Sequence, residues 1–78
     1  MLRVEFTIEP FVEGQPGPHV TAALDAVRAL GPDVDFGPFG TSFQASTEVA
    51  AASMSALVSA AYAHGATHVS IHVERISS

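Results

Sequence analysis

Hydrophobic and polar residues alternate strictly near both ends of the chain. Residues 2–9 place an apolar side chain at every even position and a polar or charged one at every odd position. Residues 68–74 alternate in the same way, with Val69, Ile71 and Val73 as the apolar members. A period of two predicts a strand with one buried face. Shorter patterns at 34–36 and 41–45 predict two more strands between them.

Two segments have helical spacing instead. The first helix is expected to begin at Pro18, which suits a first helical turn, and to stop at Gly31-Pro32. The second is expected to begin after Ser46 or Thr47, either of which can cap it, and to end at His64-Gly65. The two predicted apolar stripes are Val20, Leu24, Val27 and Leu30, and Ala50, Met54, Leu57 and Ala61.

The resulting order, βαββαβ, predicts an α+β fold: a ferredoxin-like sandwich whose four-stranded antiparallel sheet carries both helices on one face. One domain, residues 1–78, is expected. In the usual strand order of this fold the first strand is central and the fourth lies beside it. The open face would then collect Glu5, Thr7, Glu9, His68, Ser70 and His72. Such a face is either solvated or covered by a second subunit, and the small size of the domain favours coverage.

The amino-acid composition argues against several classes of function. The 78 residues include three basic and eight acidic side chains, for a net charge of −5, which argues against binding nucleic acid. The absence of cysteine excludes disulfides, thiolate metal sites and a cysteine nucleophile. No apolar run approaches a signal peptide or a membrane span. We therefore expect a cytoplasmic homo-oligomer, a dimer or tetramer that associates through the sheet face, with no membrane partner.

A glycine- and proline-rich segment, Gly37-Pro38-Phe39-Gly40-Thr41-Ser42-Phe43, joins the two middle strands. Glycine permits unusual turn conformations and proline fixes φ, so the segment predicts a tight hairpin. The hairpin carries an aromatic ring and two hydroxyl groups, which suits contact with a small ligand. By its place in the alternation, Phe43 is expected to belong to the core.

Several of these features together resemble the YkoF-like small thiamine-binding domain family. The hairpin Gly37-Pro38-Phe39-Gly40-Thr41 is close to the family's Gly-Pro-Met-Gly-Thr form. Pro10-Phe11 follows the first strand, a helix begins near His19-Val20, and the second helix ends in His64-Gly65-Ala66, as in the family. The resemblance implies a ferredoxin-like domain that associates through its sheet. It also implies a non-catalytic protein that binds thiamine or its hydroxymethyl-pyrimidine moiety, with no cofactor.

Thiamine has a cationic thiazolium ring and an aminopyrimidine ring, so its site needs aromatic faces, hydrogen-bond partners and a nearby carboxylate. Three of the candidates leave an alternative open: Glu9 as a solvated surface charge, Thr41 as a partner of the turn backbone, and Phe39 as a residue buried against its own core instead of one in contact with a ligand or an interface. The candidate ligand-binding residues are Glu9, Phe11, Phe39, Gly40, Thr41, Ser42 and Gln44.

Two other functions have partial support in the sequence, a metal site and a catalytic triad. His68 and His72 lie on one strand face but about 13 Å apart by strand rise, so a metal would need a second subunit or Glu5 and Glu9. A Ser/His/acid triad around Ser70 lacks a nucleophile elbow or phosphate loop, and we expect no enzymatic activity. The main alternative to ligand binding is a structural or interaction module that assembles through its sheet, with or without a metal at His68 and His72.

Overall fold

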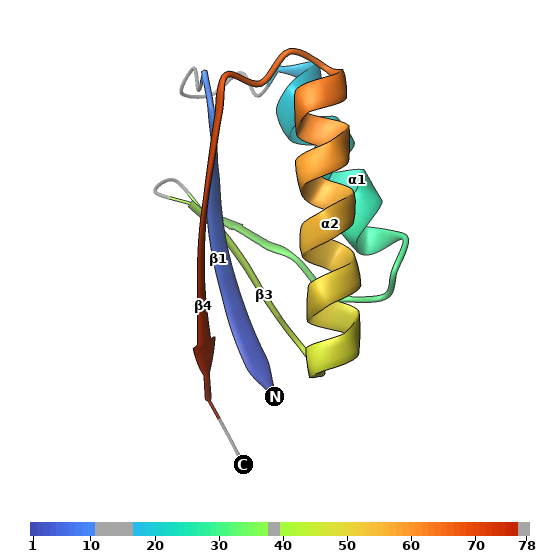
Figure 1. The fold of residues 1–78 in the computed structure, drawn as a ribbon, viewed down its shortest axis with the longest axis vertical. Coiled ribbons are helices and arrows are strands. Elements are labelled where there is room, and N and C mark those ends of the chain that lie inside the picture. The colour runs from blue at the N-terminus through green and yellow to red at the C-terminus, as the bar shows by residue number, and fades with distance from the viewer. Residues whose placement is uncertain (11–16, 38–39, 77–78) are drawn as a thin grey trace.

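The computed structural model describes residues 1–10, 17–37 and 40–76. Its sheet has the order β2-β3-β1-β4, all neighbouring strands are antiparallel, and both helices cover one face (Figure 1). The predicted ferredoxin-like βαββαβ fold is thereby confirmed. The elements are β1 (Leu2–Glu9), α1 (Pro18–Arg28), β2 (Asp35–Gly37), β3 (Gly40–Ala45), α2 (Thr47–Ala63) and β4 (His68–Arg75).

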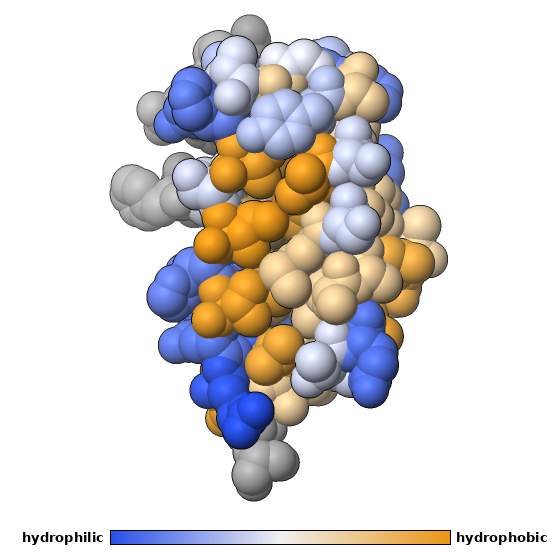
Figure 2. Space-filling view, viewed as in Figure 1, coloured by the Kyte–Doolittle hydropathy of each residue, from blue (hydrophilic) through white to orange (hydrophobic). Residues whose placement is uncertain are grey.

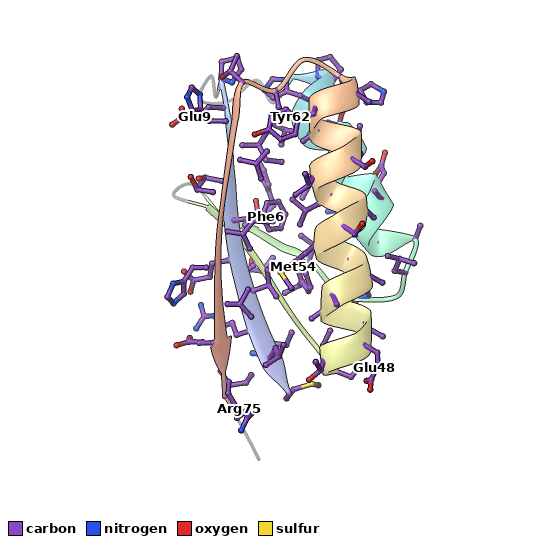
Figure 3. The ribbon with its side chains drawn as sticks, viewed as in Figure 1. Phe6, Glu9, Glu48, Met54, Tyr62 and Arg75 are labelled. Carbon is purple, nitrogen blue, oxygen red and sulfur yellow. The ribbon has the colours of Figure 1, made fainter. Side chains whose placement is uncertain are left out.

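The central strand β1 divides its side chains between two faces as the alternation predicts. Val4, Phe6 and Ile8 are at most 5% exposed and lie under the helices. Figure 3 shows Phe6 directed toward the helices and Glu9 directed away from them. The register with β4 sets Glu5 opposite His72, so the expected gathering of polar residues on the open face is confirmed.

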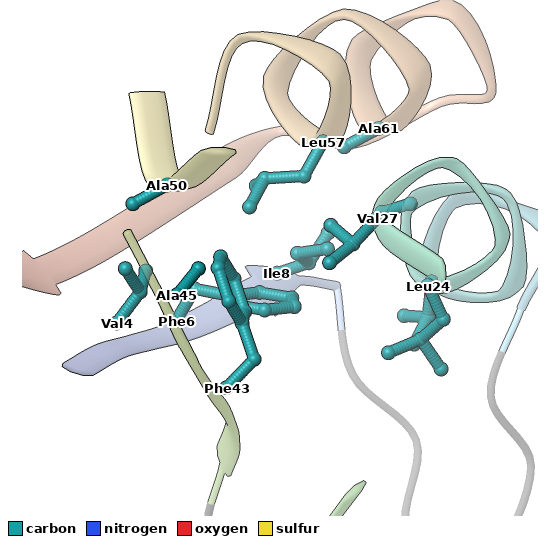
Figure 4. Packing of buried hydrophobic residues seen from close by; sticks show 12 residues of the cluster. Val4, Phe6, Ile8, Leu24, Val27, Phe43, Ala45, Ala50, Leu57 and Ala61 are labelled. Carbon is teal, nitrogen blue, oxygen red and sulfur yellow. The ribbon is translucent and has the colours of Figure 1, made fainter. Parts of the chain in front are cut away.

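The core forms where the covered face of the sheet meets both helices (Figure 4). Phe6 and Phe43 pack edge to face with ring centroids 6.2 Å apart, a favoured arrangement for aromatic pairs. Phe43 is 3% exposed, which confirms it as a core residue. From α2, Leu57 is fully buried between the sheet and α1.

The helix ends follow the capping signals, with two adjustments. Pro18 occupies the first turn of α1, but that helix ends at Arg28, so the prediction that Leu30 joins its buried stripe was wrong: Leu30 lies in the following turn and is 44% exposed. At α2, the Ser46 hydroxyl accepts a hydrogen bond from the Val49 amide at 3.3 Å, so Ser46 rather than Thr47 is the cap. Gly65 ends α2 with φ of +103°, a conformation that glycine adopts without strain.

The buried stripe of α2 differs from the expected one at a single position. Ala50, Leu57 and Ala61 are buried as predicted, but the fourth residue of the deepest row is Ser53, whereas Met54 is only partly buried. A small side chain at position 53 lets α2 lie close to its neighbours. Neither described helix is long and apolar enough to cross a membrane.

Candidate functional site

The open face of the sheet is hollowed into a shallow depression of about 410 Å³. It lies over the middle of β1 and reaches the strands on both sides, β3 and β4. Most of its lining side chains are polar. The lining residues are Arg3, Glu5, Phe6, Thr7, Gly40, Thr41, Ser42, Ser70, Ile71 and His72.

Glu5 lies at the centre of this depression. Its two cross-strand neighbours are Ser42 on β3 and His72 on β4. Its Oε1 is 3.2 Å from Nη2 of Arg3, and the two side chains are 49% and 43% exposed. An ion pair this exposed contributes little to stability. A carboxylate has several acceptor positions, so Glu5 can accept a further hydrogen bond from a bound molecule while it stays paired.

Hydroxyl and imidazole groups surround the carboxylate. Thr7 pairs with Ser70 across β1 and β4, and both line the depression together with Ser42 and His72. Each hydroxyl can donate and accept, and the imidazole adds a flat, polarisable face. The depression therefore combines the Arg3–Glu5 ion pair with neutral hydrogen-bonding groups, which is suited to a polar heterocycle that carries amino groups.

Gly40 keeps the β3 side of the depression open. A Cβ at this position would lie 3.7 Å from the Phe6 carbonyl oxygen and 3.7 Å from Cγ2 of Thr7, which is ordinary van der Waals contact. A side chain would thus be tolerated but would occupy space in the depression. Gly40 is one of the residues that the sequence singled out, and it lines the depression.

The other predicted residues of β3 divide between the two faces. Ser42 lies on the open face and lines the depression. Thr41 is 6% exposed and shares the helix side with Phe43, so what it offers to the depression is main chain. Gln44 is exposed on the open face opposite Arg3 but outside the depression. Phe11 and Phe39 lie outside the described residues.

Glu9 lies beyond the depression, at the end of β1. Its carbonyl oxygen accepts hydrogen bonds from the Thr67 amide at 2.8 Å and the Thr67 hydroxyl at 3.2 Å. Its Oε2 is 3.6 Å from Nδ1 of His68, and both side chains are more than half exposed. The β1–β3 pairing reaches Phe6, so Glu9 lies beyond the part of β1 that pairs with β3.

The histidines have separate environments. His68 lies beside Glu9, and His72 lies opposite Glu5. Among the described residues, no cluster of three or more histidine, aspartate or glutamate side chains could hold a metal ion. His64 donates through Nδ1 to the Ala60 carbonyl at 2.8 Å, as expected for a histidine at the negative end of a helix. The His19 ring bonds to the Pro10 carbonyl, which ties the start of α1 to the end of β1.

Sequence reasoning missed several residues of the depression as candidates. Arg3, Glu5, Thr7, Ser70 and His72 all line it, and none of them is among the predicted ligand-binding residues. The alternation of apolar and polar residues could have identified most of them. It places Glu5, Thr7, Ser70 and His72 on the same open face of the sheet. The hairpin motif drew attention to the edge of the site, although its centre is on the central strand.

Comparison with known proteins supports the fold but gives no activity. No family model matches the chain, and no curated protein matches it by sequence. Among solved structures, the chain is similar to a domain of unknown function, DUF77, from Bacillus cereus, with a TM-score of 0.68 and 18% identity over 94% of this chain and 71% of that one. It is also similar to protein SP2199 from Streptococcus pneumoniae, with a TM-score of 0.61 and 17% identity over 99% of this chain and 87% of that one. At such identities the likeness is one of fold.

Proposed function

We propose that this domain is a non-catalytic binding protein for a small, flat, amino-bearing or cationic heterocycle, with thiamine or its hydroxymethyl-pyrimidine moiety as the first candidates. The proposed place of action is the cytoplasm. The proposed site is the depression on the open face of the sheet, with Glu5 at its centre.

The position of Glu5 carries the proposal. Its carboxylate lies between the cross-strand neighbours Ser42 and His72 in an open hollow, where it can accept hydrogen bonds from an amino group and offset a ring charge. The overall charge of −5 favours cationic ligands over anionic ones. The resemblance of the hairpin to the thiamine-binding family points to the same chemistry.

Isothermal titration calorimetry tests the proposal. We expect heat on titration with thiamine or hydroxymethyl-pyrimidine. For Glu5→Gln we expect a dissociation constant raised roughly 10- to 100-fold, because a hydrogen bond to a charged group contributes about 1.5–3 kcal/mol. Glu48→Gln is the matched control: it makes the same change on an exposed residue in the first turn of α2, away from the depression, and should leave the affinity unchanged.

Two outcomes would count against the proposal. The first is an absence of heat and of thermal shift with both compounds at millimolar concentration. The second is binding that Glu5→Gln and Glu48→Gln affect equally, which would place the ligand elsewhere on the chain.

A second candidate function is an interaction module that assembles with copies of itself. The observation that favours it is an apolar surface along β4 and the neighbouring side of α2, shown in orange and tan in Figure 2. The two functions are compatible, because this surface and the depression lie on different sides of β4.

A further inference from the structure

Rows of paired residues cross the open face of the sheet, and the row through Glu5 runs over all four strands. On one side of Glu5, Ser42 of β3 is its cross-strand neighbour, and Asp35 of β2 is in turn the neighbour of Ser42. His72 of β4 lies on the other side. Residues directly opposite one another share a face of the sheet. Asp35, which is exposed, therefore places a carboxylate beside the β2 side of the depression.

The next row borders the depression at the Arg3 end. Arg3 of β1 lies opposite Gln44 of β3 and opposite Glu74 of β4. Glu74 is exposed and adds a second carboxylate, on the β4 side. We call Asp35 and Glu74 the acidic rim. Neither is among the residues that line the depression, but each is the cross-strand neighbour of one that does.

The positive charge at the depression is already paired. The chain has three basic residues, all of them arginine. Arg28 belongs to α1, and Arg75 lies at the end of β4 with the parity of the helix side, so Arg3 alone reaches the depression. Its Nη2 lies 3.2 Å from Oε1 of Glu5. Among the described residues the acidic rim forms no ion pair, so its two negative charges are not offset.

The described part of the open face also lacks the groups with which proteins hold phosphate. Those groups are arginine and lysine side chains and the free amides at a helix N-terminus. The chain has no lysine, and both helices cover the opposite face of the sheet (Figure 1). A phosphate group in the depression would have to take Arg3 from Glu5, or lie near the acidic rim without a cation. Both arrangements bring like charges together, which is unfavourable.

We propose that the depression binds the free alcohol form of its ligand and excludes the phosphate ester of the same compound. This inference rests on the proposed function and narrows its ligand class to an unphosphorylated heterocycle with a hydroxyl group. Thiamine and hydroxymethyl-pyrimidine each have such a hydroxyl. A phosphate ester there carries a charge of about −1.5 to −2 at neutral pH. Asp35 and Glu74 are then specificity-determining residues that act through their charge.

Calorimetric titration with thiamine and with thiamine monophosphate tests the exclusion. We expect the dissociation constant of the ester to be at least about tenfold higher at low salt, because like charges oppose its binding. Raising the salt concentration from about 0.02 M to about 0.5 M should narrow this difference, since it screens exposed charges. Exclusion by shape alone would not respond to salt in this way.

Neutral variants of the acidic rim assign the exclusion to its two residues. Asp35→Asn and Glu74→Gln each remove one charge with little change of shape, and both positions are exposed, so circular dichroism should show an unchanged fold. Each variant should reduce the ratio of the two dissociation constants by roughly two- to fivefold, the size of an exposed charge interaction. Glu48→Gln, at the start of α2, is the matched control and should leave the ratio unchanged.

The outcomes separate this inference from the proposed function. If thiamine binds and its monophosphate binds equally well or more tightly, the exclusion is wrong and the binding function stands. A preference for thiamine that neither salt nor the two rim variants reduce would also overturn the role of the acidic rim. If neither compound binds, the proposed function fails and this inference fails with it.

Discussion

The two faces of the sheet are built from the same strands, but one face packs against the helices and the other is exposed. On β1 the even-numbered residues Val4, Phe6 and Ile8 are almost fully buried, whereas the neighbouring Glu5 and Thr7 are exposed. The covered face is closely packed and apolar; the open face is hollowed, polar and carries an exposed ion pair. Stability and ligand binding should therefore be separable by substitutions only one residue apart.

The largest effect is expected on the covered face. Phe6→Ala should lower the free energy of unfolding by about 3–5 kcal/mol, because it removes a buried aromatic ring and leaves a cavity beside Phe43. Urea denaturation followed by circular dichroism measures the change. Thr7→Ala, the next residue, is the control and should change stability by less than about 0.5 kcal/mol. Equal losses in the two variants would mean that the faces are not separated in this way.

An intermediate effect is expected at two neighbouring residues of β3. Ser42→Ala should weaken binding of the proposed ligand by roughly 2- to 12-fold, the range for the loss of one neutral hydrogen bond. Thr41→Val should leave the affinity unchanged, because the Thr41 side chain is buried on the helix side. Calorimetric titration compares them. If Thr41→Val binds the ligand more weakly than Ser42→Ala, the ligand contacts the helix side of β3 and not the open face.

The smallest effect is expected at Ser53, in the deepest row of α2. Its Oγ is buried and has no hydrogen-bond partner among the described residues. Replacing an unpaired buried hydroxyl with a methyl group removes a desolvation cost, so Ser53→Ala should stabilise the domain by about 1 kcal/mol or less. A shift of the urea midpoint to higher concentration is the expected result. A clear destabilisation would mean that the hydroxyl has a partner.

The alternation of β1 and β4 was enough to predict which residues point to the core and which to the open face, because side-chain direction in a strand follows from its period of two. The capping residues Pro18, Ser46 and Gly65 likewise marked helix ends from local chemistry alone. Even the burial of Thr41 was present in the sequence, since it shares the parity of Phe43.

The composition of the site could not be predicted in the same way. Which open-face residues meet depends on strand order and register, and these pairings join segments that are far apart in the chain. Glu9 is a predicted ligand-binding residue, but β3 pairs only as far as Phe6, and Glu9 lies beside His68 instead. Local periodicity thus determined the strands, the helices and the two faces of the sheet. Only long-range pairing decided that Glu5, rather than Glu9, is the acid at the centre of the depression.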